Sequence, residues 1–252
     1  DANTTGNQNI AIGKNALGAN TTGSANVAMG QSALGANTTA SNNTAIGVEA
    51  LVANTTGPSN VAVGRGALEA NTTASANVAI GASSLNVSTT GGDNTAVGES
   101  SGIDITTGAN NLCLGNAAGR SDSPSGSITT GSNNIVLGNN SSSNAYIKVA
   151  FTVTSDQRDK IEDGVVSHGL DFVNQLKPKS FWFRKNRNSD EKHGDKRYGF
   201  YAQDILALEG SDSVIIDSKD SDNLKFKGDQ LIPVLVNAIK ELSAKVTALE
   251  AG

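Results

Sequence analysis

The sequence predicts a mainly β repeat solenoid, a β-roll or β-helix, followed by an α+β region that ends in a long helix. Three observations support this prediction. A motif returns every 17 residues along the first 140 residues, the composition changes near residue 145, and the C-terminal end carries apolar residues at coiled-coil spacing. Every aromatic residue lies at or after Tyr146, so the repeats must fold without an aromatic core.

The repeats set the length of one structural unit. A six-residue insertion near positions 121–127 delays the last copy, and all other copies are 17 residues apart. The block that begins Asn3-Thr4-Thr5 returns at Asn20, Asn37, Asn54 and Asn71, and in altered form at Ser88, Ile105 and Ile128.

Each repeat contains one short predicted strand. In Ile10-Ala11-Ile12, large and small side chains alternate with the period of two that is typical of a strand. The small middle residue indicates close approach of another backbone layer, and the following Gly13 allows a tight corner. A second element, Ala16-Leu17, supplies one more buried side chain per coil. Coils this short bury little alone, so we expect them to stack, with ladders of equivalent Asn and Thr side chains.

Two other interpretations of the repeated motif are open. Asn-Thr-Thr is formally an N-glycosylation acceptor, although a hydrogen-bonded turn explains its constant place in a structural repeat more simply. Regular threonines could also form an ice-binding face, which needs flat arrays of outward-facing Thr. We favour the structural turn.

The repeat region resembles known fibrous proteins. The large/small pattern and blocks such as Asn9-Ile10-Ala11-Ile12-Gly13 are similar to the β-roll heads of trimeric bacterial adhesins, and related repeats occur in phage fibres. The resemblance covers about 135 residues and implies a homotrimer.

The C-terminal region carries a more specific set of motifs. The segment Ser155-Asp156-Gln157-Arg158-Asp159-Lys160 matches a Ser-Asp-x-Arg-x-Lys signature, and four further blocks follow in order. Together they resemble the auto-processing C-terminal chaperones of phage tail spikes, tail fibres and endosialidases. One departure is Gly228, where that family often has an aromatic residue. The four blocks begin at Leu170 (a short helix), Phe181 (a strand), Tyr198 and Asp229 (the start of the last helix).

The resemblance implies a serine/lysine dyad. Ser155 would be the nucleophile and Lys160 the general base, and the cleavage site would lie between Thr154 and Ser155. A lysine acts as a base only in its neutral form, so Lys160 would have to be desolvated. Without the surrounding motifs, an ordinary polar turn would be the preferred interpretation. Residues five apart lie on different faces of a helix, so the pair must meet through a loop or across chains.

The remaining polar candidates receive structural roles. Asp156 and Arg158 are expected to position the loop, and His168 and His193 to be structural or solvated. In the last helix, apolar residues step by four and three, which predicts a short coiled-coil seam over about two heptads. These residues are Leu235, Ile239, Leu242, Val246 and Leu249.

These observations predict three regions: a fibre or adhesin-like repeat domain at 1–140, a connecting strand and cleavage junction at 141–154, and an auto-cleaving intramolecular chaperone at 155–252 with its terminal helix at 230–250. The predicted function is a phage tail fibre segment for host attachment, whose chaperone drives homotrimer assembly in register and is then released by single-turnover self-cleavage. The alternative is a structural trimeric fibre or adhesin with a permanent, non-cleaving trimerisation domain.

The composition excludes several classes of partner molecule. The formal net charge of -5 and the scarcity of Lys and Arg in the repeats argue against nucleic acid, and no apolar run approaches the length of a membrane span. The single cysteine, Cys113, cannot supply a metal cluster, and we expect no metal or cofactor. We expect the chain in a virion tail fibre assembled in the host cytoplasm. A receptor on the host cell, either a glycan or a protein, is compatible with the sequence.

Overall fold

The computed structural model forms two compact units, Asp1–Ser142 and Ser143–Gly252. The structure describes residues 2–121, 123, 125–142, 146, 148, 155, 157–162, 164–184, 188–211, 213–219, 221–222 and 224–252.

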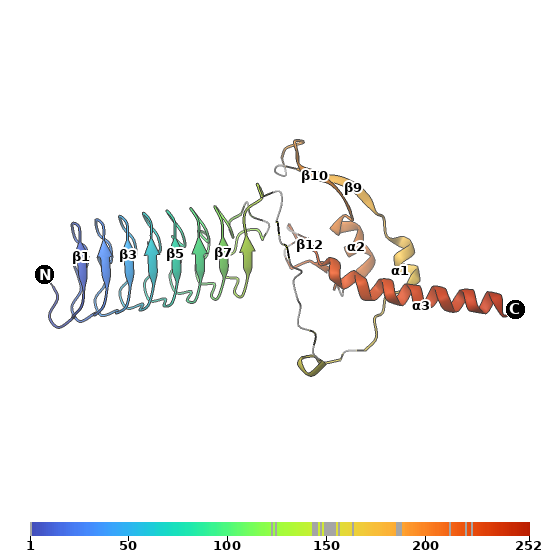
Figure 1. Ribbon diagram of the computed structural model, residues 1–252, viewed down its shortest axis with the longest axis horizontal. Helices are drawn as coiled ribbons and strands as arrows, with labels where there is room; N and C mark the ends of the chain where they lie inside the picture. The colour runs from blue at the N-terminus through green and yellow to red at the C-terminus, as the bar shows by residue number, and fades with distance from the viewer. Residues whose placement is uncertain are drawn as a thin grey trace. The chain divides into compact units, whose positions relative to one another are not determined.

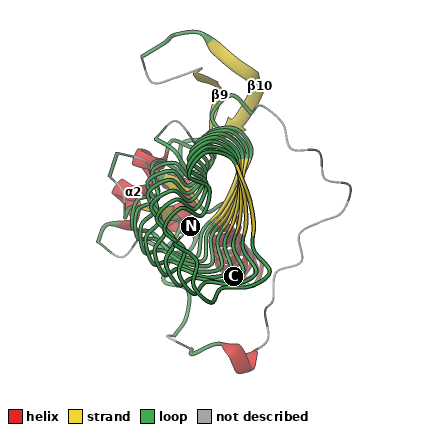
Figure 2. Cartoon of the chain, turned by 90° about the vertical axis from the view of Figure 1, so that its left-hand side faces the viewer, coloured by secondary structure: helices red, strands yellow, loops and turns green. Residues whose placement is uncertain are grey.

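The first unit is a parallel β-solenoid, which confirms the predicted fold class for this region. Eight three-residue strands form one sheet in chain order, and each strand pairs with the next in parallel. The register follows the repeat, because Ala28 lies opposite Ala45, one period further along. Figure 1 shows the strands side by side, and Figure 2 looks along the stacked coils. The strands are β1 (Ile10–Ile12), β2 (Val27–Met29), β3 (Thr44–Ile46), β4 (Val61–Val63), β5 (Val78–Ile80), β6 (Thr95–Val97), β7 (Leu112–Leu114) and β8 (Ile135–Leu137).

The interior of the solenoid is built from small and aliphatic side chains. The middle residue of a strand points inward, and Ala45 is fully buried there. The second element supplies a buried pair such as Ala50 and Leu51, as expected, but it forms turns and no strand. The eighth and seventh strands carry larger middle residues, Val136 and Cys113, in place of alanine. Stacked coils therefore cover one another's apolar interior without aromatic residues.

Buried asparagines tie each coil to the next, as predicted. Asn37 is fully buried, and its side-chain Nδ2 donates to Oδ1 of Asn20 at 2.8 Å. A second row uses its side-chain oxygen, since the backbone N–H of Asn43 donates to Oδ1 of Asn26 at 3.0 Å. Threonine differs from the expectation: the Thr21 hydroxyl donates to the backbone carbonyl of the next coil at 2.9 Å, and no hydroxyl-to-hydroxyl ladder is formed among the described residues. The burial of the repeated asparagines favours the structural turn over glycosylation.

The first asparagine row ends inside the stack. After Asn71 the equivalent position holds Ser88, whose shorter side chain does not continue the row. The side-chain oxygens of both residues are buried and have no hydrogen-bond partner in the described part of the chain. The next position is Ile105, which is fully buried. The row therefore changes from polar to apolar side chains, and the two buried oxygens at the change lack a hydrogen-bond partner among the described residues.

The second unit is a small α+β structure that ends in a long helix, as predicted. Strands β9 and β10 form an antiparallel pair, as do β11 and β12. The terminal helix α3 begins one residue after its predicted start and ends at its predicted end. The elements are the 3₁₀ turn η1 (Gln157–Asp159), α1 (Leu170–Gln175), β9 (Lys179–Arg184), β10 (Lys192–Gly199), α2 (Ala202–Glu209), β11 (Ile216–Asp217), β12 (Lys225–Phe226), the 3₁₀ turn η2 (Gly228–Gln230) and α3 (Leu231–Glu250).

The core of the second unit joins α1, α2, β11 and the start of α3. It contains one aromatic residue and five aliphatic residues, and a buried carboxylate lies beside it. Glu209 at the end of α2 accepts backbone N–H groups from three successive residues at 2.6–3.0 Å, which anchors the segment entering β11. The core residues are Phe172, Ile205, Ile215, Ile216, Leu231 and Val234.

Candidate functional site

The predicted dyad residues meet within one chain. Ser155 precedes η1 and Lys160 follows it, with the backbone N–H of Lys160 donating to the carbonyl of Gln157 at 3.1 Å. This single turn brings the Lys160 side chain back over the start of the segment. Its Nζ lies 2.6 Å from Oγ of Ser155 and 3.3 Å from the Ser155 carbonyl oxygen. Two residues five apart therefore come into hydrogen-bond contact through a turn.

The distance suits proton transfer, but the surroundings differ from the expectation. A general base must lie within about 2.6–3.2 Å of the proton it removes, and the Nζ–Oγ distance falls in that range. Both side chains are nevertheless exposed in the single chain. The predicted desolvation of Lys160 is therefore not provided by the described residues of one chain. An exposed ammonium group can donate to the serine hydroxyl, whereas catalysis requires a neutral amine that accepts from it.

Several predicted neighbours of the dyad lie outside the described residues. Thr154, which would carry the carbonyl to be cut, is one of them, and Asp156 is another. Arg158 lies within η1 and is exposed. The strand predicted to begin at Tyr146 also falls mainly outside the described residues, as does the connection to the repeats.

Contacts between α1 and α3 hold the second unit together. The backbone N–H of Leu170 donates to Oε2 of Glu241 at 2.8 Å, which places a carboxylate at the N-terminus of α1. The Asn237 side chain donates to the carbonyl of His168 at 3.0 Å. Sequence analysis did not find either contact, because polar residues at these positions also fit a solvated helix face.

The two histidines make no contact with the dyad. The ring of His168 stacks on Phe172 with the centroids 4.2 Å apart, which supports its structural interpretation. His193 lies on β10, and its Nε2 is buried without a hydrogen-bond partner among the described residues. The part of the chain that the structure describes contains no group of three or more His, Cys, Asp or Glu that could hold a metal ion. It also contains no helix long and apolar enough to span a membrane.

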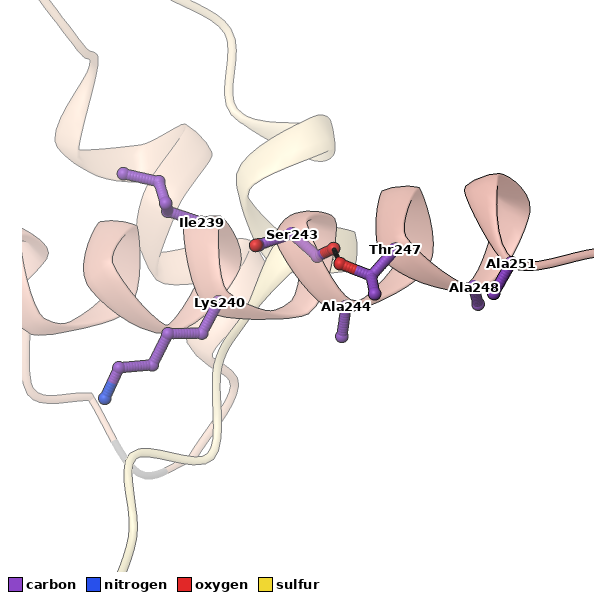
Figure 3. Close-up of a pocket in the computed structure, with 7 residues that line it drawn as sticks. All are labelled: Ile239, Lys240, Ser243, Ala244, Thr247, Ala248 and Ala251. Atoms are coloured by element: carbon purple, nitrogen blue, oxygen red, sulfur yellow. Dashed lines mark hydrogen bonds between the residues drawn. The ribbon is translucent and has the colours of Figure 1, made fainter.

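Helix α3 carries apolar residues on two faces. One face packs into the core of its own unit through Leu231, Val234 and Ala238. The predicted seam lies elsewhere and is exposed, with Ile239 at 65% and Leu249 at 82%. Figure 3 shows side chains along the C-terminal half of the helix, where the small side chains of Ala244 and Ala248 project on the side opposite to Ile239. The single chain therefore leaves the seam available to another helix.

The hairpin of β9 and β10 combines aromatic and basic side chains, a feature that sequence analysis did not single out. The Nζ of Lys192 lies 4.0 Å from the ring centroid of Trp182, and Arg197 lies 5.4 Å from that of Phe183. Such contacts stabilise exposed rings on a two-stranded sheet. The sequence signal was the aromatic run at 181–183, followed about ten residues later by a segment at 192–197 that contains three basic residues.

Comparison with known protein families gives one match. Residues 155–213 match the family model described as chaperone of endosialidase. The match begins at Ser155 and covers α1, β9, β10 and α2. No curated protein and no solved structure matches the chain.

Proposed function

We propose that this chain, whose C-terminal unit carries a chaperone-of-endosialidase domain, is a segment of a phage tail fibre that assembles as a homotrimer. The observation that carries the proposal is the family match beginning at Ser155, together with the 2.6 Å contact between that serine and Lys160. The C-terminal unit would first bring three chains together, and the repeats would then assemble from that end. The fibre would take part in host attachment within the virion.

A repeated structure needs a device that sets its register. The coils repeat every 17 residues, so a chain displaced by one coil would present similar side chains to its partners. A domain of unique sequence that associates first would exclude displaced arrangements, because only one alignment of three identical domains gives threefold symmetry. The exposed seam of α3 supports this role, since it offers apolar side chains to other helices.

We propose that the dyad then cuts the chain before Ser155. Lys160 would accept the hydroxyl proton as Oγ attacks the carbonyl carbon of Thr154, and it would return a proton to the leaving backbone nitrogen of Ser155. The product is an ester between the Thr154 acyl group and the serine oxygen. Water then hydrolyses the ester, which leaves a carboxylate on Thr154 and a free amino terminus on Ser155. The reaction needs no cofactor and turns over once.

The exposure of Lys160 in the single chain indicates when cleavage should occur. Removal of water from the amine favours its neutral form. Association of three chains would supply that desolvation, so cleavage would follow assembly. Release of the chaperone would leave a fibre whose persistence depends on its unfolding barrier, since the assembly domain is no longer attached.

The test compares the intact mass of the freshly purified protein with that of Ser155→Ala and Lys160→Met variants. We expect two fragments that divide between Thr154 and Ser155 in the unsubstituted protein, and a single intact chain in both variants. Ser167→Ala and Lys177→Met are matched controls, because both residues are exposed and lie in the same unit outside the dyad. The controls should be cut like the unsubstituted protein.

The same exposure of Lys160 favours one alternative, a permanent trimerisation domain on a structural fibre or adhesin. In that case the contact with Ser155 would be an ordinary hydrogen bond in a polar turn. A single mass near 25.6 kDa from folded, trimeric, unsubstituted protein would establish the alternative and refute self-cleavage.

A further inference from the structure

The outward surface of the solenoid sheet is uncharged along its whole length, and it is apolar except at Thr44 and Thr95. The first and third residues of each strand point outward, and we call these two rows the strand face. Figure 2 shows the strands aligned on one side of the coils. No charged residue occurs in either row. The third-position row is Ile12, Met29, Ile46, Val63, Ile80, Val97, Leu114 and Leu137, and seven of its members are at least 37% exposed.

The eight coils provide a comparison inside one chain. At the third strand position, seven of the eight coils carry an aliphatic residue and the other carries Met29. Two residues further on, after the corner glycine, the coils carry residues as different as Lys14, Gln31, Val48 and Glu99, although that row is also exposed. At this exposed position the coils therefore accept positively charged, negatively charged, polar and aliphatic side chains. The uniformly apolar row indicates that something covers the strand face in the working protein.

We infer that the strand face is covered by the strand faces of two further copies of this chain, packed around a threefold axis that runs along the stack. This inference rests on the proposed trimeric function and names the surface that the trimer buries in the repeats. An axis parallel to the stack places equal coils of the three chains at the same level. Side chains from equivalent positions then meet, which suits aliphatic residues and would be unfavourable for any charge.

The strand face would need a separate domain to align the chains. Eight strands at about 4.8 Å spacing, each with three residues at about 3.3 Å rise, give a face of roughly 350 Å² in projection. Its side chains repeat from coil to coil, so a chain displaced by one coil would present a similar face. The strand face should therefore hold chains that are already aligned, and it should not set their register by itself.

The test uses thiol labelling at two matched positions in coil three. Ile46 is 38% exposed on the strand face, and Val48 is 41% exposed in the variable row. Ile46→Cys and Val48→Cys are each placed in the full chain with Ser155→Ala, so that the result does not depend on cleavage. Native mass spectrometry gives the number of copies, and a thiol reagent of the dithiobis-nitrobenzoate type gives the labelling rate. Cys113 is buried and contributes little background.

We expect a trimer in which the thiol at position 46 reacts about tenfold more slowly than the thiol at position 48, because the assembled copies cover only the first. Addition of denaturant should make the two rates equal. A trimer with equal rates at both positions would overturn the strand-face inference and leave the assembly function intact. A monomer would contradict the proposed assembly function itself. Protection by a different polypeptide, visible as extra mass, would also overturn the inference.

Aspartate substitutions at positions 46 and 48 give an independent measurement. Ile46→Asp would bring three carboxylates together near the axis, whereas Val48→Asp would leave them in solvent. We expect both variants to remain trimers through the C-terminal unit, and only the first to lower the melting temperature of the repeats in circular dichroism. Equal melting temperatures for the two variants would refute the strand-face packing.

Discussion

The two units of this chain organise their apolar side chains in different ways. Each coil of the solenoid buries a small set, such as Ala50 and Leu51, against the coils before and after it. The second unit gathers residues from distant elements into one core, which includes Phe172 of α1 and Ile205 of α2. The solenoid therefore gains stability as a sum over neighbouring coils, whereas the second unit depends on one core that forms as a whole.

The two units also differ in the apolar side chains that they leave exposed. The solenoid exposes one regular face, and the second unit exposes the seam of α3 and separate side chains such as Ile161, at 98%, and Tyr198, at 86%. In the proposed trimer, the strand face and the seam of α3 would lie between the chains. The difference lies in sequence: the solenoid face repeats and cannot define a register, whereas the seam occurs once.

The largest effect is expected where backbones of successive coils touch. A Cβ added to Gly47 would lie 2.5 Å from the carbonyl oxygen of Gly64, and the backbone φ of Gly47 is +137°. Gly47→Ala should therefore destabilise the solenoid by more than about 4 kcal/mol. Gly210 of the second unit also has a positive φ, of +73°, but a Cβ there meets nothing within 4 Å. Gly210→Ala should cost only about 1–3 kcal/mol, for backbone strain.

The two glycine variants are compared by thermal unfolding, with two probes that separate the units. Circular dichroism reports both units, whereas the fluorescence of Trp182, the single tryptophan, reports only the second. A loss of stability at Gly47 that is no larger than the loss at Gly210 would contradict the close stacking of coils.

A smaller effect is expected from the buried carboxylate of the second unit. Glu209→Gln exchanges an acceptor of three backbone N–H groups for a neutral amide, so we expect a loss of about 2–3 kcal/mol. Denaturant unfolding followed by Trp182 fluorescence measures this change. Glu162→Gln is the matched control, because Glu162 is exposed, and it should change stability by less than about 0.5 kcal/mol. Equal effects would show that the carboxylate does not anchor β11.

Ser88→Asn should stabilise the solenoid. The asparagine would continue the row from Asn71, whose Oδ1 is now buried without a partner in the described residues. One hydrogen bond restored in this way should contribute about 1 kcal/mol, measured as a higher melting temperature in circular dichroism. Ser59→Asn serves as the control, since Ser59 is exposed and the equivalent residue of the preceding coil is already Asn42. A lower melting temperature for Ser88→Asn would contradict the continuous row.

The smallest effect on stability at neutral pH is expected from ionisation of the Cys113 thiol. Burial raises the pKa of this thiol from 9.0 to about 11. The unfolded thiol ionises first as the pH rises, so Cys113 should lower solenoid stability between about pH 9 and 11 and have no effect below pH 8. Cys113→Ala should remove that part of the pH dependence. In the folded protein at pH 8 the thiol should resist labelling, and rapid reaction there would contradict its burial.

Local patterns were sufficient to predict much of this fold. The strand at Ile10–Ile12 and its seven repeats follow from alternating large and small residues, and α3 at Leu231–Glu250 agrees with the helix predicted at 230–250. The dyad residues were identified from the motif around Ser155 and Lys160, but spacing could not show whether they meet within a chain. Their roles and the boundaries at 140 and 154 stay predictions.

The sequence by itself determined the repeat, the strand positions and the terminal helix, because each depends on contacts between residues close in the chain or one period apart. Only the tertiary structure decided that η1 returns Lys160 to Ser155, that Glu209 anchors β11 and that Glu241 meets the start of α1. The contact with Glu241 joins positions 71 residues apart. A single polar residue carries no periodic signal, so its partner is set only by how the distant elements pack.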